Sequence, residues 1–162
     1  MAKHILSVLV ENKFGVLARI SSLIAGRGFN IDSLAVGETE DPTASRMTIV
    51  VDGDDKTIEQ VKKQLNRLID VISIQDLTKE EHLDRELVFC KVTVTPKTRA
   101  QLVEIAETLK AEVADVGAKT MTIQLVGDPT KVKSLIELVK PYGIQEIVRT
   151  GRIAISRDSN GE

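Results

Sequence analysis

The most informative part of this chain reads Glu11-Asn-Lys-Phe-Gly-Val-Leu-Ala-Arg-Ile-Ser-Ser-Leu-Ile-Ala-Gly-Arg-Gly-Phe-Asn-Ile-Asp32. It predicts the end of an apolar strand, a short loop, and a helix with Gly15 at its start. Asn12 stands just before the helix and Asn30 just after it. A helix N-terminus has backbone N–H groups without partners and a partial positive charge, which suit a carboxylate. Because Gly15 lets a ligand approach the backbone closely, the stretch predicts a cradle for a small zwitterion.

The same residues also fit a purely structural role. Asn12 could cap the helix, Gly15 could simply make the turn, and Asn30 could occupy a left-handed turn. If Asn12 does bind a ligand, its amide could accept a hydrogen bond from an ammonium or donate one to a carboxylate. The spacing alone leaves these alternatives open.

Composition excludes several classes of protein. The chain has 162 residues, which allows one domain or two small ones, and a net charge of -2, which gives no electrostatic case for nucleic acid or an anionic membrane. Cys90 is the only cysteine, so an intrachain disulfide is impossible and a reducing compartment is expected. The apolar run Ile5–Val10 is too short to span a membrane and lacks a cleavage site. The sequence therefore predicts a cytoplasmic protein.

Two halves of the chain show the same order of elements, βαββαβ. The hydrophobic patterns predict a strand over 4–11, a helix over 15–27, strands over 31–38 and 47–52, a helix after Gly53, and a strand over 71–77. The second half predicts a strand over 86–95, a helix over 96–110, strands over 112–116 and 120–126, a helix opened by Asp128-Pro129, and strand over 144–155.

This duplication predicts an α+β fold with two ferredoxin-like βαββαβ domains. Each would have a four-stranded antiparallel sheet with two helices on one face. The expected boundaries are 1–78 for the first domain, 79–85 for a polar linker, and 86–162 for the second, with a frayed tail at 157–162. Since the other sheet face and the sheet edges would be left open, we expect an oligomer.

Catalytic motifs are missing from the sequence. It has no Walker loop and no Gly-x-Gly-x-x-Gly after a strand. His4 and His82 have no Cys or His at metal-ligand spacing, and Cys90 lies in an apolar strand, as a buried structural thiol would. The paired acids lie in polar connectors rather than in a pocket. The sequence thus predicts no metal, no cofactor and no catalytic role for this chain.

The motifs resemble two known patterns, one nested in the other. Val10-Glu-Asn-x-x-Gly-Val-Leu17, followed after a helix by Gly28-Phe-Asn-Ile31, resembles the signature of ACT domains, which are βαββαβ modules that bind amino acids at dimer interfaces. The wider chain resembles the small regulatory subunits of acetolactate synthase (acetohydroxyacid synthase). That resemblance rests on Ile5–Asn12, Arg27–Leu34, Asp41–Ile49 and Lys63–Val71 and, more loosely, on Arg85-Glu-Leu and Val148-x-x-Gly-x-Ile-x-x-Ser-Arg157.

The resemblance implies a role in the biosynthesis of the branched-chain amino acids valine, isoleucine and leucine. The catalytic subunit, a separate chain, would carry thiamine diphosphate, magnesium and FAD and condense two pyruvates, or pyruvate with 2-oxobutyrate, as a transferase. This chain would bind and activate that subunit and confer feedback inhibition by valine or another branched-chain amino acid.

The resemblance also implies where the effector sits, between the ACT domains of a homodimer. One copy would supply Asn12 with the backbone of Gly15, Val16 and Leu17, and the other copy would supply Asn30 and Ile31. Arg46 and Asp41-Pro42 could contact the catalytic subunit, or form a turn with a solvated arginine.

Three other functions fit parts of the sequence. A stand-alone ACT-domain sensor regulating another enzyme or a transcription factor would have the same loop motif, and only the second domain and the motif around Arg46 argue against it. RNA-recognition domains share the βαββαβ order but need aromatic residues on their central strands, and strands 5–10 and 47–51 have none. A small enzyme is disfavoured by the missing catalytic residues.

Overall fold

The computed structural model describes residues 3–157 and contains two βαββαβ-like units, which confirms the predicted fold class. The chain divides between Leu83 and Asp84 and again between Gly151 and Arg152. The first unit therefore includes the segment that begins at Arg152, and the second unit is 84–151. No helix among residues 3–157 is long and apolar enough to cross a membrane.

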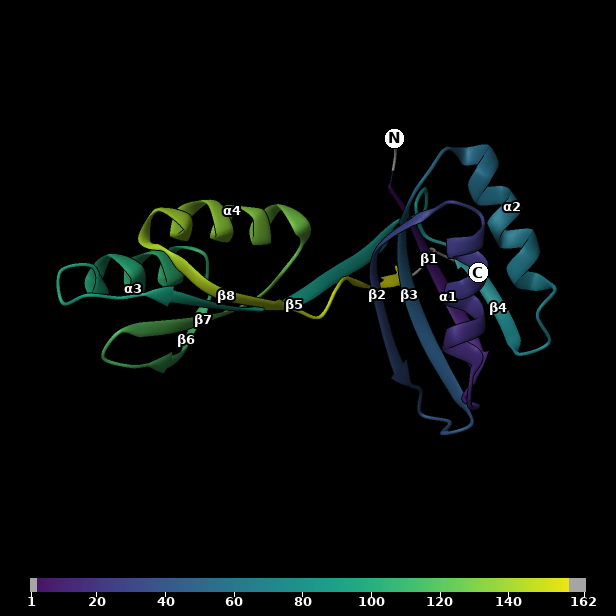
Figure 1. Cartoon of the computed structure of the whole chain (residues 1–162), viewed down its shortest axis with the longest axis horizontal. Coiled ribbons are helices and arrows are strands. Elements are labelled where there is room, and N and C mark those ends of the chain that lie inside the picture. The colour runs from purple at the N-terminus through teal and green to yellow at the C-terminus, as the bar shows by residue number, and fades with distance from the viewer. Residues whose placement is uncertain (1–2, 158–162) are drawn as a thin grey trace. The chain divides into compact units, whose positions relative to one another are not determined.

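The first unit follows the predicted order. Its elements are β1 (Lys3–Glu11), α1 (Val16–Gly26), β2 (Asn30–Glu38), β3 (Ala44–Asp52), α2 (Asp55–Asn66) and β4 (Val71–Asp76). The strands form an antiparallel sheet in the order β2-β3-β1-β4, so β2 and β4 are its edges (Figure 1).

Both helices of this unit cover the same face of its sheet. Alternate residues along β1 and β3 point to that face, because successive side chains in a strand point to opposite sides. The buried core that they form with the two helices consists of Leu6, Val8, Val10, Val16, Ile20, Ile24, Met47, Ile49, Val51, Ile58, Val61 and Leu65. At the end of α1, Gly28 has φ 77 and its N–H bonds to the Ala25 carbonyl at 3.0 Å, so that Gly28 makes a left-handed turn there.

The second unit repeats this arrangement. Its elements are β5 (His82–Thr93), α3 (Arg99–Thr108), β6 (Glu112–Val116), β7 (Thr120–Gly127), α4 (Pro129–Val139), a 3-10 helix η1 (Lys140–Tyr142) and β8 (Ile144–Arg149). The strand order is β6-β7-β5-β8. Asp128 caps α4, since its Oδ1 accepts a hydrogen bond from the Lys131 N–H at 2.9 Å, as the sequence predicts. Cys90 is buried in this core, and burial raises the pKa of its thiol.

The C-terminal segment differs from the prediction. The single strand expected over 144–155 is two strands, β8 and β9 (Ile153–Ser156), separated at Gly151, whose φ of 81 breaks the extended backbone. β9 pairs with β5, and Ala154 packs with Ile5, Val50 and Leu77.

This packing corrects the expectation of an open sheet face. Ile5 and Val50 alternate with residues of the helix-covered core, so Ala154 lies on the opposite sheet face, which is therefore partly covered rather than open. By its contacts, the segment from Arg152 groups with the first unit. The expected linker 79–85 is also shorter, because β5 already begins at His82. Of the predicted frayed tail, 158–162 lie outside the described residues.

Candidate effector site

The first turn of α1 is open. Gly15 precedes it with φ 83, offers no side chain as a cap, and is followed by no acidic residue in that turn. The Val16 N–H makes a long contact of 3.4 Å with the Lys13 carbonyl, and the Arg19 N–H bonds to the Gly15 carbonyl at 3.1 Å. Among the described residues, the N–H groups of Leu17 and Ala18 have no acceptor. This is the free helix N-terminus that suits a carboxylate.

Asn12 does not cap this helix. Its Nδ2 donates to the Pro42 carbonyl at 3.0 Å, and its backbone N–H donates to the Thr43 carbonyl at 2.7 Å. Its side chain is exposed, and its Oδ1 makes no hydrogen bond within the described part of the chain. The helix-capping alternative for Asn12 is therefore wrong, and its amide is held by the turn before β3.

Two cations flank the open helix turn. Arg19 forms an ion pair with the buried Asp70 carboxylate, and a Cβ on Gly15 would lie 3.6 Å from Nη1 of Arg19. Lys13 Nζ lies 2.8 Å from Glu11 Oε2, and this hydrogen bond raises the pKa of Lys13. The sequence analysis did not include Arg19 among the site residues. The one sequence feature that could have indicated it is its position four residues after Gly15, about one helical turn away.

The other predicted residues lie at the start of β2. Asn30 is exposed and stands opposite Asp52 in the β2–β3 ladder, while Ile31 is half-buried and packs against the core. Asn30 is extended rather than left-handed, since Gly28 makes the left-handed turn. Next to them, Lys3 Nζ and Asp32 Oδ2 are 2.8 Å apart.

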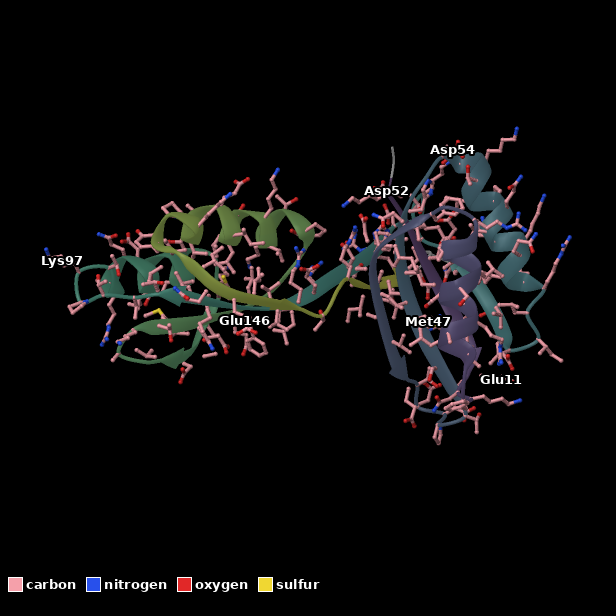
Figure 2. All side chains as sticks on the ribbon, in the orientation of Figure 1. Glu11, Met47, Asp52, Asp54, Lys97 and Glu146 are labelled. Atoms are coloured by element: carbon pink, nitrogen blue, oxygen red, sulfur yellow. The ribbon has the colours of Figure 1, made fainter. Side chains whose placement is uncertain are left out.

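The structure groups the six predicted residues into two sets. Asn12, Gly15, Val16 and Leu17 lie at one end of α1, and Asn30 and Ile31 lie beyond its other end. The 11 residues of α1 place its ends roughly 16 Å apart at the usual helical rise. Figure 2 shows Glu11, next to the first set, and Asp52, opposite Asn30, at opposite ends of the unit. One copy of the chain does not bring the two sets together.

The residues of the first set differ in which of their atoms a ligand could reach. Val16 is buried in the core, so only its backbone is available to a ligand. Leu17 is 45% exposed and offers apolar surface beside the free N–H groups. The first set can therefore hold a carboxylate with backbone groups and contact an aliphatic side chain.

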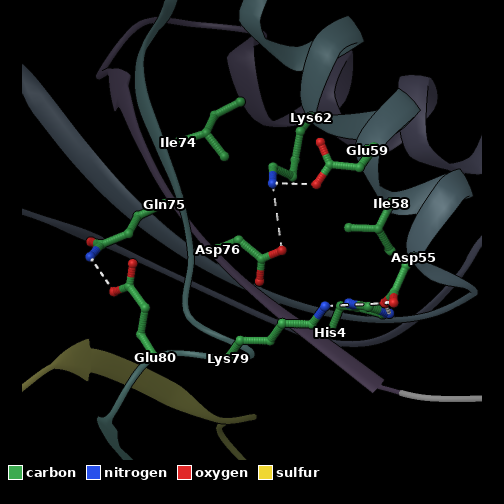
Figure 3. Close-up of a pocket in the computed structure, with 10 residues that line it drawn as sticks. All are labelled: His4, Asp55, Ile58, Glu59, Lys62, Ile74, Gln75, Asp76, Lys79 and Glu80. Atoms are coloured by element: carbon green, nitrogen blue, oxygen red, sulfur yellow. Dashed lines mark hydrogen bonds and ion pairs between the residues drawn. The ribbon is translucent and has the colours of Figure 1, made fainter.

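A separate cavity of about 460 Å³ lies between α2 and β4 (Figure 3). It is lined by His4, Asp55, Ile58, Glu59, Lys62, Ile74, Gln75, Asp76, Lys79 and Glu80, none of which belongs to the predicted site. Its charged groups pair with one another: Lys62 lies 2.8 Å from Glu59 and 3.7 Å from Asp76, and Lys79 lies 3.6 Å from Asp55. Over residues 3–157, no cluster of three or more His, Cys, Asp or Glu side chains could hold a metal ion.

Comparisons with known proteins place this chain in a family. Residues 6–73 match the family described as AHAS small subunit-like ACT domain, and residues 85–158 match the family described as small subunit of acetolactate synthase. The chain is 51% identical to the acetolactate synthase small subunit of Aquifex aeolicus, over 96% of this chain and 82% of that protein. It is 48% identical to the probable small subunit of Archaeoglobus fulgidus, over 96% and 97%. The crystal structure of the Thermotoga maritima small subunit matches with a TM-score of 0.89 and 36% identity, over 97% of this chain and 98% of that one.

Proposed function

Because the chain belongs to the family of acetolactate synthase small subunits, we propose that it regulates a catalytic acetolactate synthase subunit. It binds that subunit, raises its activity and makes it sensitive to inhibition by valine, without catalysing a reaction itself. The thiamine diphosphate, magnesium and FAD belong to the catalytic subunit. The observation that carries this proposal is the open first turn of α1 beside Asn12, inside the ACT domain.

The effector binds between two copies of the chain. Its carboxylate meets the first turn of α1, where Gly15, Val16 and Leu17 present backbone, and Asn12 stands beside it. Asn30 and Ile31 come from the other copy. Two observations support this arrangement: the two sets lie at opposite ends of α1, and β2 is an edge strand whose outer backbone groups can pair with a second copy.

The effector is a branched-chain amino acid. Its aliphatic side chain contacts exposed apolar surface such as that of Leu17. Burying an isopropyl group contributes about 1.5–2 kcal/mol. One additional methylene changes binding by only ~1–3 kcal/mol, so apolar contact alone discriminates weakly between valine and isoleucine.

Inhibition works by linkage between two binding events. Valine bridges two ACT domains and thereby favours one arrangement of the dimer, while the active catalytic subunit favours another. The coupling must be reciprocal, so the catalytic subunit weakens valine binding by the same factor.

Gly15→Asp tests the site. The new carboxylate occupies the place of the effector carboxylate, so valine binding and valine inhibition should be lost. An Asp at φ 83 costs on the order of 1–2 kcal/mol, so the unit should still fold. Valine binding is measured by calorimetry, and acetolactate formation is measured after mixing with the catalytic subunit. Gly151→Asp is the matched control, because Gly151 has nearly the same φ, 81, and lies outside the site. Equal affinity of Gly15→Asp and the unmodified chain for valine would show that the site is misplaced.

A pull-down tests the partner. The tagged full chain is used to capture proteins from an extract of its own cells, and the eluate is assayed for acetolactate formation with and without valine. We expect synthase activity that valine inhibits. Capture of a different enzyme or of a transcription factor would instead support the stand-alone sensor.

A further inference from the structure

A groove of about 600 Å³ lies between α1 and α2. Its wall on α1 includes Ala18, Ser22 and Gly26, which are four residues apart and therefore lie on one side of that helix. These residues have small side chains or none, and all three are exposed. Leu23 and Leu68 line the same groove and are half-buried. The groove therefore has room for a side chain of another molecule and offers that side chain apolar contact.

The groove lies away from the sheet edge at which we place the second copy of the chain. α1 packs on β2, and α2 packs on β4. Because β2 and β4 are the opposite edges of the sheet, the space between the two helices lies over its middle strands, β3 and β1. Pairing of β2 with another copy therefore leaves this groove free for a different partner.

The charge around the groove is basic. Residues 12–31 and 60–69, which contain all of its lining residues, have three lysines or arginines each and no aspartate or glutamate. The chain as a whole, by contrast, has a net charge of -2. Arg27, Lys63 and Arg67 are exposed and make no ion pair within residues 3–157. A partner that presents an apolar side chain surrounded by acidic residues therefore complements this surface.

We propose that the catalytic acetolactate synthase subunit docks in this groove, with an apolar side chain between the helices and acidic residues against the surrounding cations. This inference rests on the proposed function. A second copy of the chain does not fit there, because a symmetric contact would bring the same basic surface to both sides. The groove also includes Arg19, which lies beside Gly15 at the proposed effector site. The docked subunit and valine thus contact one helix, α1, whose position both can bias.

The first test fills the groove. Ser22→Tyr places a bulky side chain in it, and the control Thr108→Tyr places the same side chain on the exposed surface of α3. The affinity of each full-length variant for the purified catalytic subunit is measured by titration, and valine binding to the variant alone is measured by calorimetry. Ser22→Tyr should weaken binding of the catalytic subunit about tenfold or more and leave valine affinity unchanged, whereas Thr108→Tyr should change neither.

The second test reverses the charge. Arg27→Glu combined with Arg67→Glu removes two unpaired cations, and the control, Lys97→Glu combined with Arg99→Glu, makes the same change in net charge at exposed positions around the start of α3. The unmodified chain should bind the catalytic subunit more weakly as salt rises, because salt screens the attraction. The first double variant should bind about tenfold more weakly at low salt and lose this salt dependence. The control should keep both the affinity and the salt dependence, which a purely structural effect would also leave unchanged.

Three results would overturn the docking site and leave the proposed function standing. The first is unchanged affinity for the catalytic subunit in either groove variant. The second is an equal loss of affinity in a groove variant and in its control. The third is an unmodified chain that binds single-stranded RNA or anionic vesicles more tightly than the catalytic subunit, which would assign the cations to that ligand. An unmodified chain that does not bind the catalytic subunit at all would overturn the proposed function as well.

Discussion

Helices α1 and α3 occupy the same place in two units with the same order of elements, yet the loops before them differ. Before α3, the Thr95 N–H bonds to Thr98 Oγ1 at 2.9 Å, the Thr98 N–H bonds to Thr95 Oγ1 at 3.2 Å, and the Arg99 N–H bonds to the Thr95 carbonyl at 3.0 Å. Before α1, Gly15 supplies no side chain, and the loop instead places the Asn12 amide beside the turn. Both helices therefore begin without a side-chain cap, but only the first has an asparagine amide beside its open turn.

The second helices of the two units show that this difference is local. α2 and α4 are capped alike, by Asp54 on the Thr57 N–H at 2.7 Å and by Asp128 on the Lys131 N–H at 2.9 Å. α1 and α3 both lack such a cap, and α1 has Asn12 beside its open turn. The proposed ligand site therefore depends on local residues and not on the βαββαβ fold itself.

The largest expected effect comes from truncating the core under each first helix. Ile20 of α1 and Leu102 of α3 are fully buried, so Ile20→Ala and Leu102→Ala should each cost about 2–5 kcal/mol of unfolding free energy. Urea unfolding measures this cost, and calorimetry measures valine binding. If the units differ in function as proposed, Ile20→Ala lowers the affinity for valine, and Leu102→Ala leaves it unchanged as long as that variant stays folded. Equal losses of valine affinity in the two variants would contradict a difference in function between the units.

A smaller effect is expected at two similar ion pairs. Each unit pairs a buried carboxylate with a half-exposed arginine, Asp70 with Arg19 in the first and Glu86 with Arg149 at 2.6 Å in the second. Arg19→Ala and Arg149→Ala should each cost about 1–3 kcal/mol, because a buried carboxylate loses its partner. Only Arg19→Ala should also weaken valine binding, by about two- to fivefold, since Arg19 lies beside Gly15. A weaker valine response in Arg149→Ala would contradict this assignment.

Loosening the loop before α3 should have a still smaller effect. Replacing both Thr95 and Thr98 by alanine removes the side-chain hydrogen bonds of that loop and should cost about 1 kcal/mol, seen as a lower urea midpoint for the second unit. The number of valine molecules bound per chain should not change, because the second unit has no counterpart of Asn12 held by the turn before β3. Additional valine binding would show that an uncapped helix start without such an asparagine is sufficient for a site.

The smallest expected effect is the loss of stability in acid that comes from Asp41, in the turn between β2 and β3. The pKa of Asp41 is lowered from 3.8 by the hydrogen bonds from Thr43. A lowered pKa in the folded state means that these bonds stabilise the fold above pH 3.8 and that this contribution is lost as the pH falls through the folded-state pKa. The difference in urea midpoint between the unmodified chain and Asp41→Asn should therefore shrink between pH 5 and pH 3. A difference independent of pH would mean that the charge of Asp41 does not matter.

The sequence predicted the elements well because their signals are local. Hydrophobic spacing identified the helices, and Asp128-Pro129 marked the start of α4. It also predicted which residues lie at the first turn of α1, because Asn12 and Gly15 are close together in the chain.

The remaining features depend on contacts that spacing does not encode. The bond from Asn12 to Pro42 joins residues far apart in the chain, and the pairing of Arg19 with Asp70 does the same. The destination of β9 was also missed, because Ile153-Ala-Ile155 alternates as any strand does and says nothing about which sheet it meets.

Because Ala154 of β9 packs on the first unit, the core of that unit can be completed only late in synthesis. During translation, β1 and β3 leave the ribosome first, but Ala154, which covers Ile5 and Val50, is made only after the whole of 84–151. The second unit is thus an insertion within the first, tied to it at both ends. A ribosome that stalls after Gly151 would release a chain with every helix in place and a bare aliphatic patch on the sheet that was synthesised first.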